Sequence, residues 1–330
     1  MTTLRVGLVA DPAAPTEVAH ALADLGPSDE DTSWAVSVVS EPFTTGSEDL
    51  DTATERLRHH RDEEQWDLVV GLTELPVHDR EGRPLVVAVD DEQRVAVVSL
   101  PALGGVRRHA RARRVVRSVV EGMADEGANG DRRVPLPQGR GGARLLLGMV
   151  LANRPWLLVP GLKSALVAAL ATGAVATINS TVWLLAGSLS WWRLAVATAV
   201  SIALVVGWLV VDADLWDRPD DDSPPARQRS RLYNASTVLT LLTGVVICYA
   251  ALFAVNLAWA LFILDPAVMG GYLQSDLGYR DVVVIAWFVA SAATVGGGLG
   301  SGLDSDEAVH AAAYSKREED RRNRLREHQS

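Results

Sequence analysis

The sequence predicts two parts of different fold class: an α/β domain with a mixed, mostly parallel sheet, followed by an all-α transmembrane domain of four helices. Three observations lead to this prediction. Short apolar runs alternate with helical patterns as far as residue 126, four long apolar runs lie between residues 161 and 304, and the net charge changes sign after residue 102. We therefore divide the chain into an α/β domain, a basic juxtamembrane linker, a four-helix region and a charged tail, over 1–126, 127–160, 161–304 and 305–330.

Strands and helices alternate through the N-terminal domain. Runs rich in Val and Leu predict strands, and segments with apolar residues three or four apart predict helices. Two short strands joined by an acidic turn precede the last helix, so we expect the sheet to be mixed. The expected strands cover 4–11, 34–42, 66–76 and 83–100, and the expected helices cover 16–26, 47–65 and 106–123.

Four apolar runs are long enough to cross a bilayer, which needs about 20 helical residues. The third run has 30 residues without Pro, and without Gly after Gly244, so we expect one tilted or protruding helix. Tryptophans lie near both ends of the second run, where indole rings favour the membrane interface. The four spans are 162–186, 194–211, 235–264 and 282–303.

Basic residues are distributed unequally among the loops. The loop over 212–234 carries four arginines and the tail carries six basic residues, whereas the two other loops carry only Arg193 and Arg280. Loops rich in Lys and Arg stay in the cytoplasm. We therefore expect a multi-pass protein of the plasma (inner) membrane with both termini in the cytoplasm.

An acidic block precedes a basic one. Residues 1–102 hold seven arginines against 21 acidic residues, and residues 103–154 hold 11 arginines against four. A basic segment next to apolar spans favours the anionic inner leaflet as a partner, although contact with the acidic domain would explain it equally well. The segment has no Phe, Tyr or Trp, which argues against nucleic acid. The candidates for lipid-headgroup contact are Arg107, Arg108, Arg111, Arg113, Arg114 and Arg117.

The spans contain few polar residues. None has an ionisable residue near its middle, which argues against transport or proton relay. Asn179 and Asn256 are the strongest polar residues, and we regard them as candidates for an intramembrane polar contact. The alternative is two amides solvated near the outer headgroups. The single cysteine, Cys248, excludes an internal disulfide and a Cys-based metal site.

Two phrases of the N-terminal domain, "DLVVGLTELPVHD" and "RVAVVSLPAL", resemble the archaemetzincin branch of the zincin metallopeptidases. The resemblance covers residues 1–126 and implies a zincin-like fold, in which the helix over 106–123 would be the catalytic helix. In that family this helix carries H-E-x-x-H-x-x-G-x-x-H, whose histidines bind Zn²⁺ and whose Glu activates water.

The helix lacks these ligands. The nearest alignment places Glu121 at the family's Glu, with Val120 and Ala124 at the two His positions. We therefore expect a degenerate site of which Glu121, Thr73 and His78 are the remnant, with no catalytic residue, cofactor or metal.

These observations predict a cytoplasmic binding or regulatory module attached to the membrane, with a protein partner that the sequence does not identify. One alternative is a membrane-tethered enzyme whose site lies near 73–78 and 90–92. The other is a small membrane carrier with a regulatory cytoplasmic domain. Turnover or bound metal would favour the enzyme, and solute flux into liposomes would favour the carrier.

The arginine distribution generates a topology prediction. Cysteines introduced at Ser47 and Ser330 should react with a membrane-impermeant maleimide only after cells are permeabilised, because both positions belong to cytoplasmic segments. Labelling of either position in intact cells would contradict the topology.

Overall fold

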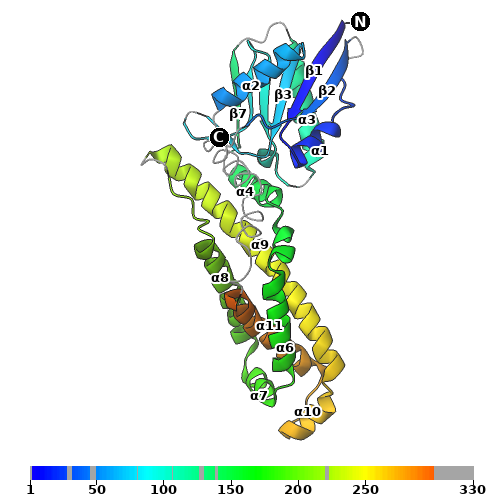
Figure 1. Ribbon diagram of the computed structural model, residues 1–330, viewed down its shortest axis with the longest axis vertical. Coiled ribbons are helices and arrows are strands. Elements are labelled where there is room, and N and C mark those ends of the chain that lie inside the picture. Colours follow the sequence, from blue (N-terminus) through cyan, green and yellow to red (C-terminus); the bar gives the residue numbers. More distant parts are fainter. Residues whose placement is uncertain are drawn as a thin grey trace, which may run out of the picture. The chain divides into compact units, whose positions relative to one another are not determined.

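The computed structural model (Figure 1) contains two compact units. Among the described residues, the first comprises those up to Ala152 together with Asp217–Ser236, and the second comprises Asn153–Trp216 and those from Thr237 to Gly300. The predicted charged tail, 305–330, lies outside the described residues. The structure describes residues 2–27, 32–44, 50–79, 81–105, 107–125, 130–137, 140–219 and 223–300.

A mixed sheet forms the centre of the first unit, which confirms the predicted α/β character. Four parallel strands lie in the order β2-β1-β3-β6, and β5 pairs antiparallel with β6. The two remaining strands, β4 and β7, pair antiparallel with β5. The strands are β1 (Thr2–Ala10), β2 (Thr32–Ser40), β3 (Leu68–Thr73), β4 (Val77–His78), β5 (Pro84–Asp90), β6 (Val95–Ser99) and β7 (Asp131–Pro135).

Helices cover both faces of this sheet (Figure 1). α1 (Ala14–His20) and α3 (Arg108–Ala124) contribute side chains to the hydrophobic cluster on one face. α2 (Leu50–Glu63) contributes to the cluster on the other face. Every residue of β3 is buried, as expected for a parallel strand covered on both sides.

Two glycines allow large side chains to lie directly on the sheet. A Cβ atom on Gly7 would fall 1.9 Å from the Trp66 ring. A Cβ atom on Gly71 would fall 2.6 Å from Leu57 and 2.7 Å from Phe43. The layer that contains α2 therefore packs against bare backbone at these two positions.

The predicted boundary at residue 126 is corrected by β7. This strand lies in the segment that we predicted to be a linker (127–160), and it extends the sheet along β5. Its sequence, DRRVP, has no apolar alternation, and four of its five residues are exposed. Backbone pairing and a salt bridge fix it in place: Arg132 Nε and Nη2 donate to the buried carboxylate of Asp91 at 2.5 and 2.6 Å.

Most of the other described residues of the predicted linker are helical. α4 (Arg140–Ala152) packs on the short helix η1 (Pro101–Leu103), and Gly148 makes this possible because a Cβ atom there would lie 2.1 Å from the Pro101 carbonyl oxygen. Leu145 and Met149 of α4 share a hydrophobic cluster with Tyr233. η2 (Pro155–Leu157) and α5 (Leu158–Gly161) follow α4 along the chain.

The second unit is all-helical among the residues that the structure describes. Three helices are long and apolar enough to cross a membrane, and up to four if a bent pair counts as one span. The bent pair joins Gly141–Gly161 to Lys163–Thr177 at 53°. The helices are α6 (Lys163–Thr177), α7 (Ser180–Ser188), α8 (Trp191–Asp212), α9 (Pro224–Ile263), α10 (Pro266–Leu273) and α11 (Tyr279–Gly300).

Three predicted spans correspond to single helices, namely α8, α9 and α11. α9 is unbroken, as predicted, and begins 11 residues before the predicted span. The first predicted span, 162–186, is wrong as a single helix because α6 ends at Thr177 and α7 begins at Ser180. Asn179 terminates the run by capping α7, since its Oδ1 accepts from the Thr181 amide at 2.9 Å.

The Asp91–Arg132 pair generates a stability prediction. Replacing Arg132 with Ala should lower the local free energy of unfolding of β7 by about 1–3 kcal/mol, because it leaves a buried carboxylate without its partner. Amide hydrogen exchange in β5, β6 and β7 measures this change.

Arg133→Ala is the matched control. Arg133 lies on the same strand, and its pair with the exposed Asp131 is longer, at 3.3 Å. Exposed pairs contribute about 0–1 kcal/mol. Equal effects of the two substitutions would contradict a specific role for the buried pair.

Candidate functional site

The carboxyl ends of the parallel strands form a polar edge in the first unit. Asp11 follows β1, Thr44 follows β2 and Thr73 ends β3, and all three are buried. Asp11 accepts hydrogen bonds from the Thr44 hydroxyl at 2.8 Å and the Phe43 amide at 3.3 Å. Open α/β sheets bind ligands at this edge, where connections leave to opposite faces. Here the buried bonds tie the three strand ends together.

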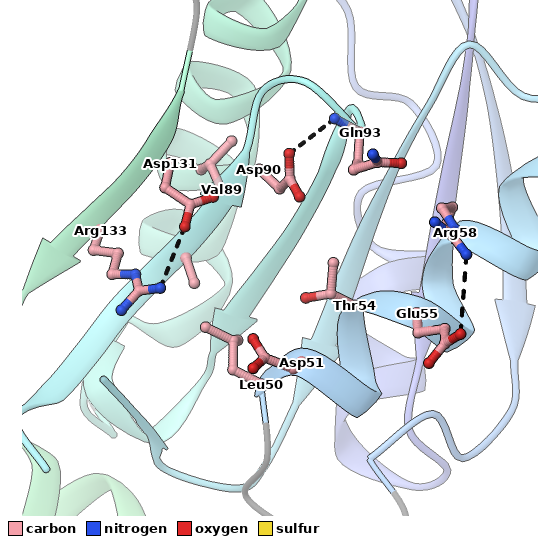
Figure 2. Close-up of a pocket in the computed structure, with 11 residues that line it drawn as sticks. Leu50, Asp51, Thr54, Glu55, Arg58, Val89, Asp90, Gln93, Asp131 and Arg133 are labelled. Carbon is pink, nitrogen blue, oxygen red and sulfur yellow. Dashed lines mark hydrogen bonds and ion pairs between the residues drawn. The ribbon is translucent and has the colours of Figure 1, made fainter. Parts of the chain in front are cut away.

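The first unit also has an open pocket, away from these strand ends. A cavity of about 300 Å³ lies between α2 and the strands β5 and β7 (Figure 2). Ala88 and Val89 contribute apolar surface to it, and Thr54 and Gln93 contribute neutral polar groups. The charged lining residues are Asp51, Glu55, Arg58, Asp90, Asp131 and Arg133.

Four carboxylates and two guanidinium groups line this pocket. Asp131 pairs with Arg133 at 3.3 Å, and Glu55 lies 3.9 Å from Arg58 (Figure 2). Asp90 accepts from the Gln93 amide at 2.8 Å, which closes the turn between β5 and β6. A wall of this kind suits a small polar ligand that carries both acidic and basic groups. Pockets for small molecules start at about this volume.

The predicted remnant site is not assembled. Thr73 lies at the carboxyl ends of the parallel strands, and His78 on β4 is separated from β3 by β6 and β5. Glu121 lies near the other end of the strands, since the neighbouring Gly122 contacts Arg132, the partner of Asp91. The three residues therefore do not form one site.

The acidic turn over 90–92 does not offer a set of free carboxylates. Asp91 is bound by Arg132, and these hydrogen bonds raise the pKa of that guanidinium. Asp90 caps its own turn. Within the described ranges, no group of three or more His, Cys, Asp or Glu side chains lies together as a metal site requires.

The six candidate headgroup arginines have different environments. Arg108 lies 3.9 Å from Glu74, and Arg113 donates to Asp24 at 2.9 Å, a bond that lowers the pKa of Asp24. Arg114 is exposed and donates to the Ala110 carbonyl of its own helix. The remaining three have no ion pair among the described residues. They are Arg107 at the exposed start of α3 and the half-buried Arg111 and Arg117.

A polar network that the sequence analysis missed joins three helices of the second unit. Thr198 on α8, Tyr249 on α9 and Ser291 on α11 form a triangle of hydroxyls, 3.0 to 3.1 Å apart. Trp287 Nε1 donates to the Thr198 hydroxyl at 2.7 Å, and Ser201 donates to the Ser291 carbonyl at 2.9 Å. Each helix supplies one or two hydroxyl groups, so the sequence shows the residues but not that they lie next to one another.

The two predicted intramembrane asparagines have different roles. Asn179 is exposed and caps α7, so it is a helix-terminating residue. Asn256 is buried on α9, donates to the Leu252 carbonyl at 2.9 Å and lies against Gly173 of α6. Asn256 therefore packs closely against α6, while its hydrogen bond stays within α9.

Comparison of the chain with protein-family models, with curated proteins and with solved structures gave no match. The functional interpretation therefore depends on the chemistry of the residues themselves.

The contact between α6 and α9 generates a packing prediction. Gly173→Val should lower the thermal midpoint of the purified protein, because a Cβ atom at Gly173 would lie 2.3 Å from Asn256 Oδ1. Overpacking of this kind costs about 1–3 kcal/mol. Gly207→Val on α8 is the control, since a Cβ atom there meets nothing within 4 Å. If both variants have the same thermal midpoint, the close approach at Gly173 does not contribute to stability.

Proposed function

We propose that the protein is a multi-pass membrane protein whose N-terminal domain is a degenerate zincin-like module with a binding or regulatory role. The observation that supports this proposal is the apolar character of the α3 face that packs on the sheet. In a zincin this helix would present its histidines to a metal ion. Here the buried residues of α3 are Ala112, Val116, Val119, Val120 and Met123.

The positions that matter most are Val120 and Ala124. Val120 is fully buried in the core with β3 and β6, so it contributes packing where the family has a zinc ligand. Glu121 is half-buried at the end of the domain away from Thr73. The helix therefore stabilises the sheet, and it lacks the zinc ligands that catalysis in that family requires.

The pocket of Figure 2 is the place where we expect a ligand of this module. Its lining carries four carboxylates and two guanidinium groups, and this mixture of charges favours a small zwitterionic molecule over a metal ion. Ligand binding there would bridge α2 and the edge strands, and in this way it could change how firmly β7 is held.

The membrane region is proposed to cross the bilayer four times. α8, α9 and α11 supply three crossings, and the bent pair that ends with α6 supplies the fourth. An even number of crossings leaves both termini on the same side of the membrane. The arginine-rich loops favour the cytoplasmic side of the plasma membrane. Among the residues that the structure describes, the bundle interior carries hydroxyl groups and no ionisable cluster, which supports an anchoring role over that of a carrier.

Metal content tests this proposal. Elemental analysis of the full-length protein in detergent should show far less than one zinc per chain. Neither a chelator nor excess Zn²⁺ should change the thermal midpoint. A metal ion that bound the folded state would raise the midpoint, and its removal would lower it. A stoichiometric metal whose removal lowers the midpoint would overturn the degenerate assignment and favour the enzyme.

A further inference from the structure

Two arginines from different helices converge on one backbone carbonyl of the first unit. Arg111 Nη1 on α3 donates to the Leu103 carbonyl oxygen at 2.8 Å, and Arg144 Nε on α4 donates to the same oxygen at 2.9 Å. A carbonyl oxygen has two lone pairs, so this acceptor is fully used. Two positive charges are thereby held side by side.

Neither charge is neutralised by the part of the chain that the structure describes. Among the described residues, each of the two guanidinium groups donates to the Leu103 carbonyl and neither has a carboxylate partner, whereas Arg108 and Arg113 do. Both side chains are half-buried, so water screens their repulsion less than it would on an open surface. Each guanidinium has five N–H donors and uses one of them here.

Gly104 shapes the place where the two side chains meet. Its φ of +79° is a conformation that other residues rarely adopt. A Cβ atom at Gly104 would lie 2.8 Å from Arg144 Cγ and 3.2 Å from Arg111 Nη1. The absence of a side chain at this glycine therefore permits the approach of both arginines.

We propose that Arg111 and Arg144 form a binding site for a phosphate group, and that the phosphate belongs to the headgroup of an anionic phospholipid. Guanidinium groups bind phosphate through paired N–H donors, and a phosphate between them would relieve their repulsion. The site is separate from the pocket of Figure 2 and does not depend on the zincin-like assignment.

The position of Arg144 favours a lipid as the source of the phosphate. α4 belongs to the segment Gly141–Gly161, which together with α6 is apolar enough for a bent span. Leu147, one turn beyond Arg144 on the same helix, is 45% exposed. A long cationic side chain on a helix that leads into an apolar segment can reach lipid headgroups.

Native mass spectrometry of the full-length protein in mild detergent tests the proposal, with palmitoyl-oleoyl phosphatidylglycerol and the matching phosphatidylcholine as probes. The wild-type protein should retain phosphatidylglycerol in preference to phosphatidylcholine. Arg111→Gln and Arg144→Gln should each reduce retention about fivefold, the effect of one cation near a headgroup. Arg114→Gln is the matched control, since it removes one exposed charge from α3 without touching the site.

Further variants separate binding from folding and identify the source of the phosphate. Arg144→Lys keeps the charge and should retain more lipid than Arg144→Gln at a similar thermal midpoint. Inorganic phosphate and glycerol 1-phosphate should raise the midpoint little, because a soluble anion lacks the contribution of the acyl chains.

The outcomes that overturn the proposal are specific. Equal retention by Arg111→Gln, Arg144→Gln and Arg114→Gln would exclude the site, as would equal retention of the two lipids by the wild-type protein. An arginine-dependent rise in the midpoint with inorganic phosphate, combined with arginine-independent lipid retention, would overturn the assignment to a lipid headgroup.

Discussion

The burial of β3 on both faces is the constraint on which the N-terminal domain depends. Leu68, Val70 and Leu72 belong to the cluster that α1 and α3 cover, and Val69 belongs to the cluster that α2 covers. A strand buried on both sides requires a layer of helix on each side of it. This requirement explains the three-layer arrangement. It also defines the edge where β3 and β6 end in register and the chain turns towards α3.

In the membrane that we propose, a different principle organises the second unit. Apolar side chains cannot select helix neighbours within a bilayer, because lipid tails are as apolar as Leu. Small residues and hydrogen bonds provide that selection. The hydroxyl triangle of Thr198, Tyr249 and Ser291 specifies how α8, α9 and α11 meet, while Gly173 and Asn256 specify how α6 meets α9. Neutral groups perform both tasks, so no charge has to be buried.

The sequence predicted those elements whose own residues carry a periodic signal. β3 is continuously apolar, and α8, α9 and α11 are long apolar runs, so each was found. β7 was missed because its residues are polar and its pairing comes from the backbone and from Arg132. The break after α6 was missed because a capping asparagine in an apolar run resembles an isolated polar residue.

The candidate sites were predictable only in part, for a related reason. Arg111 was recognised as one of six basic residues of a single helix, but its neighbour Arg144 lies on another helix and in a segment predicted to be a linker. The hydroxyl triangle likewise joins residues from three separate runs. Tertiary contacts between distant segments leave no local pattern, whereas the lack of family ligands at Val120 and Ala124 is visible in the sequence alone.

The break at Asn179 would also affect how the proposed bundle fits the lipid around it. α6 has 15 residues, or about 22 Å of helix, while α8 has 22 residues, or about 33 Å. The hydrocarbon core of a typical bilayer is about 30 Å thick. In the membrane that we propose, α8 would cross this core by itself, whereas α6 would need the helical segment that it is bent against. A crossing of two segments would follow a change in bilayer thickness at its bend, whereas a single helix such as α8 would follow it by tilting.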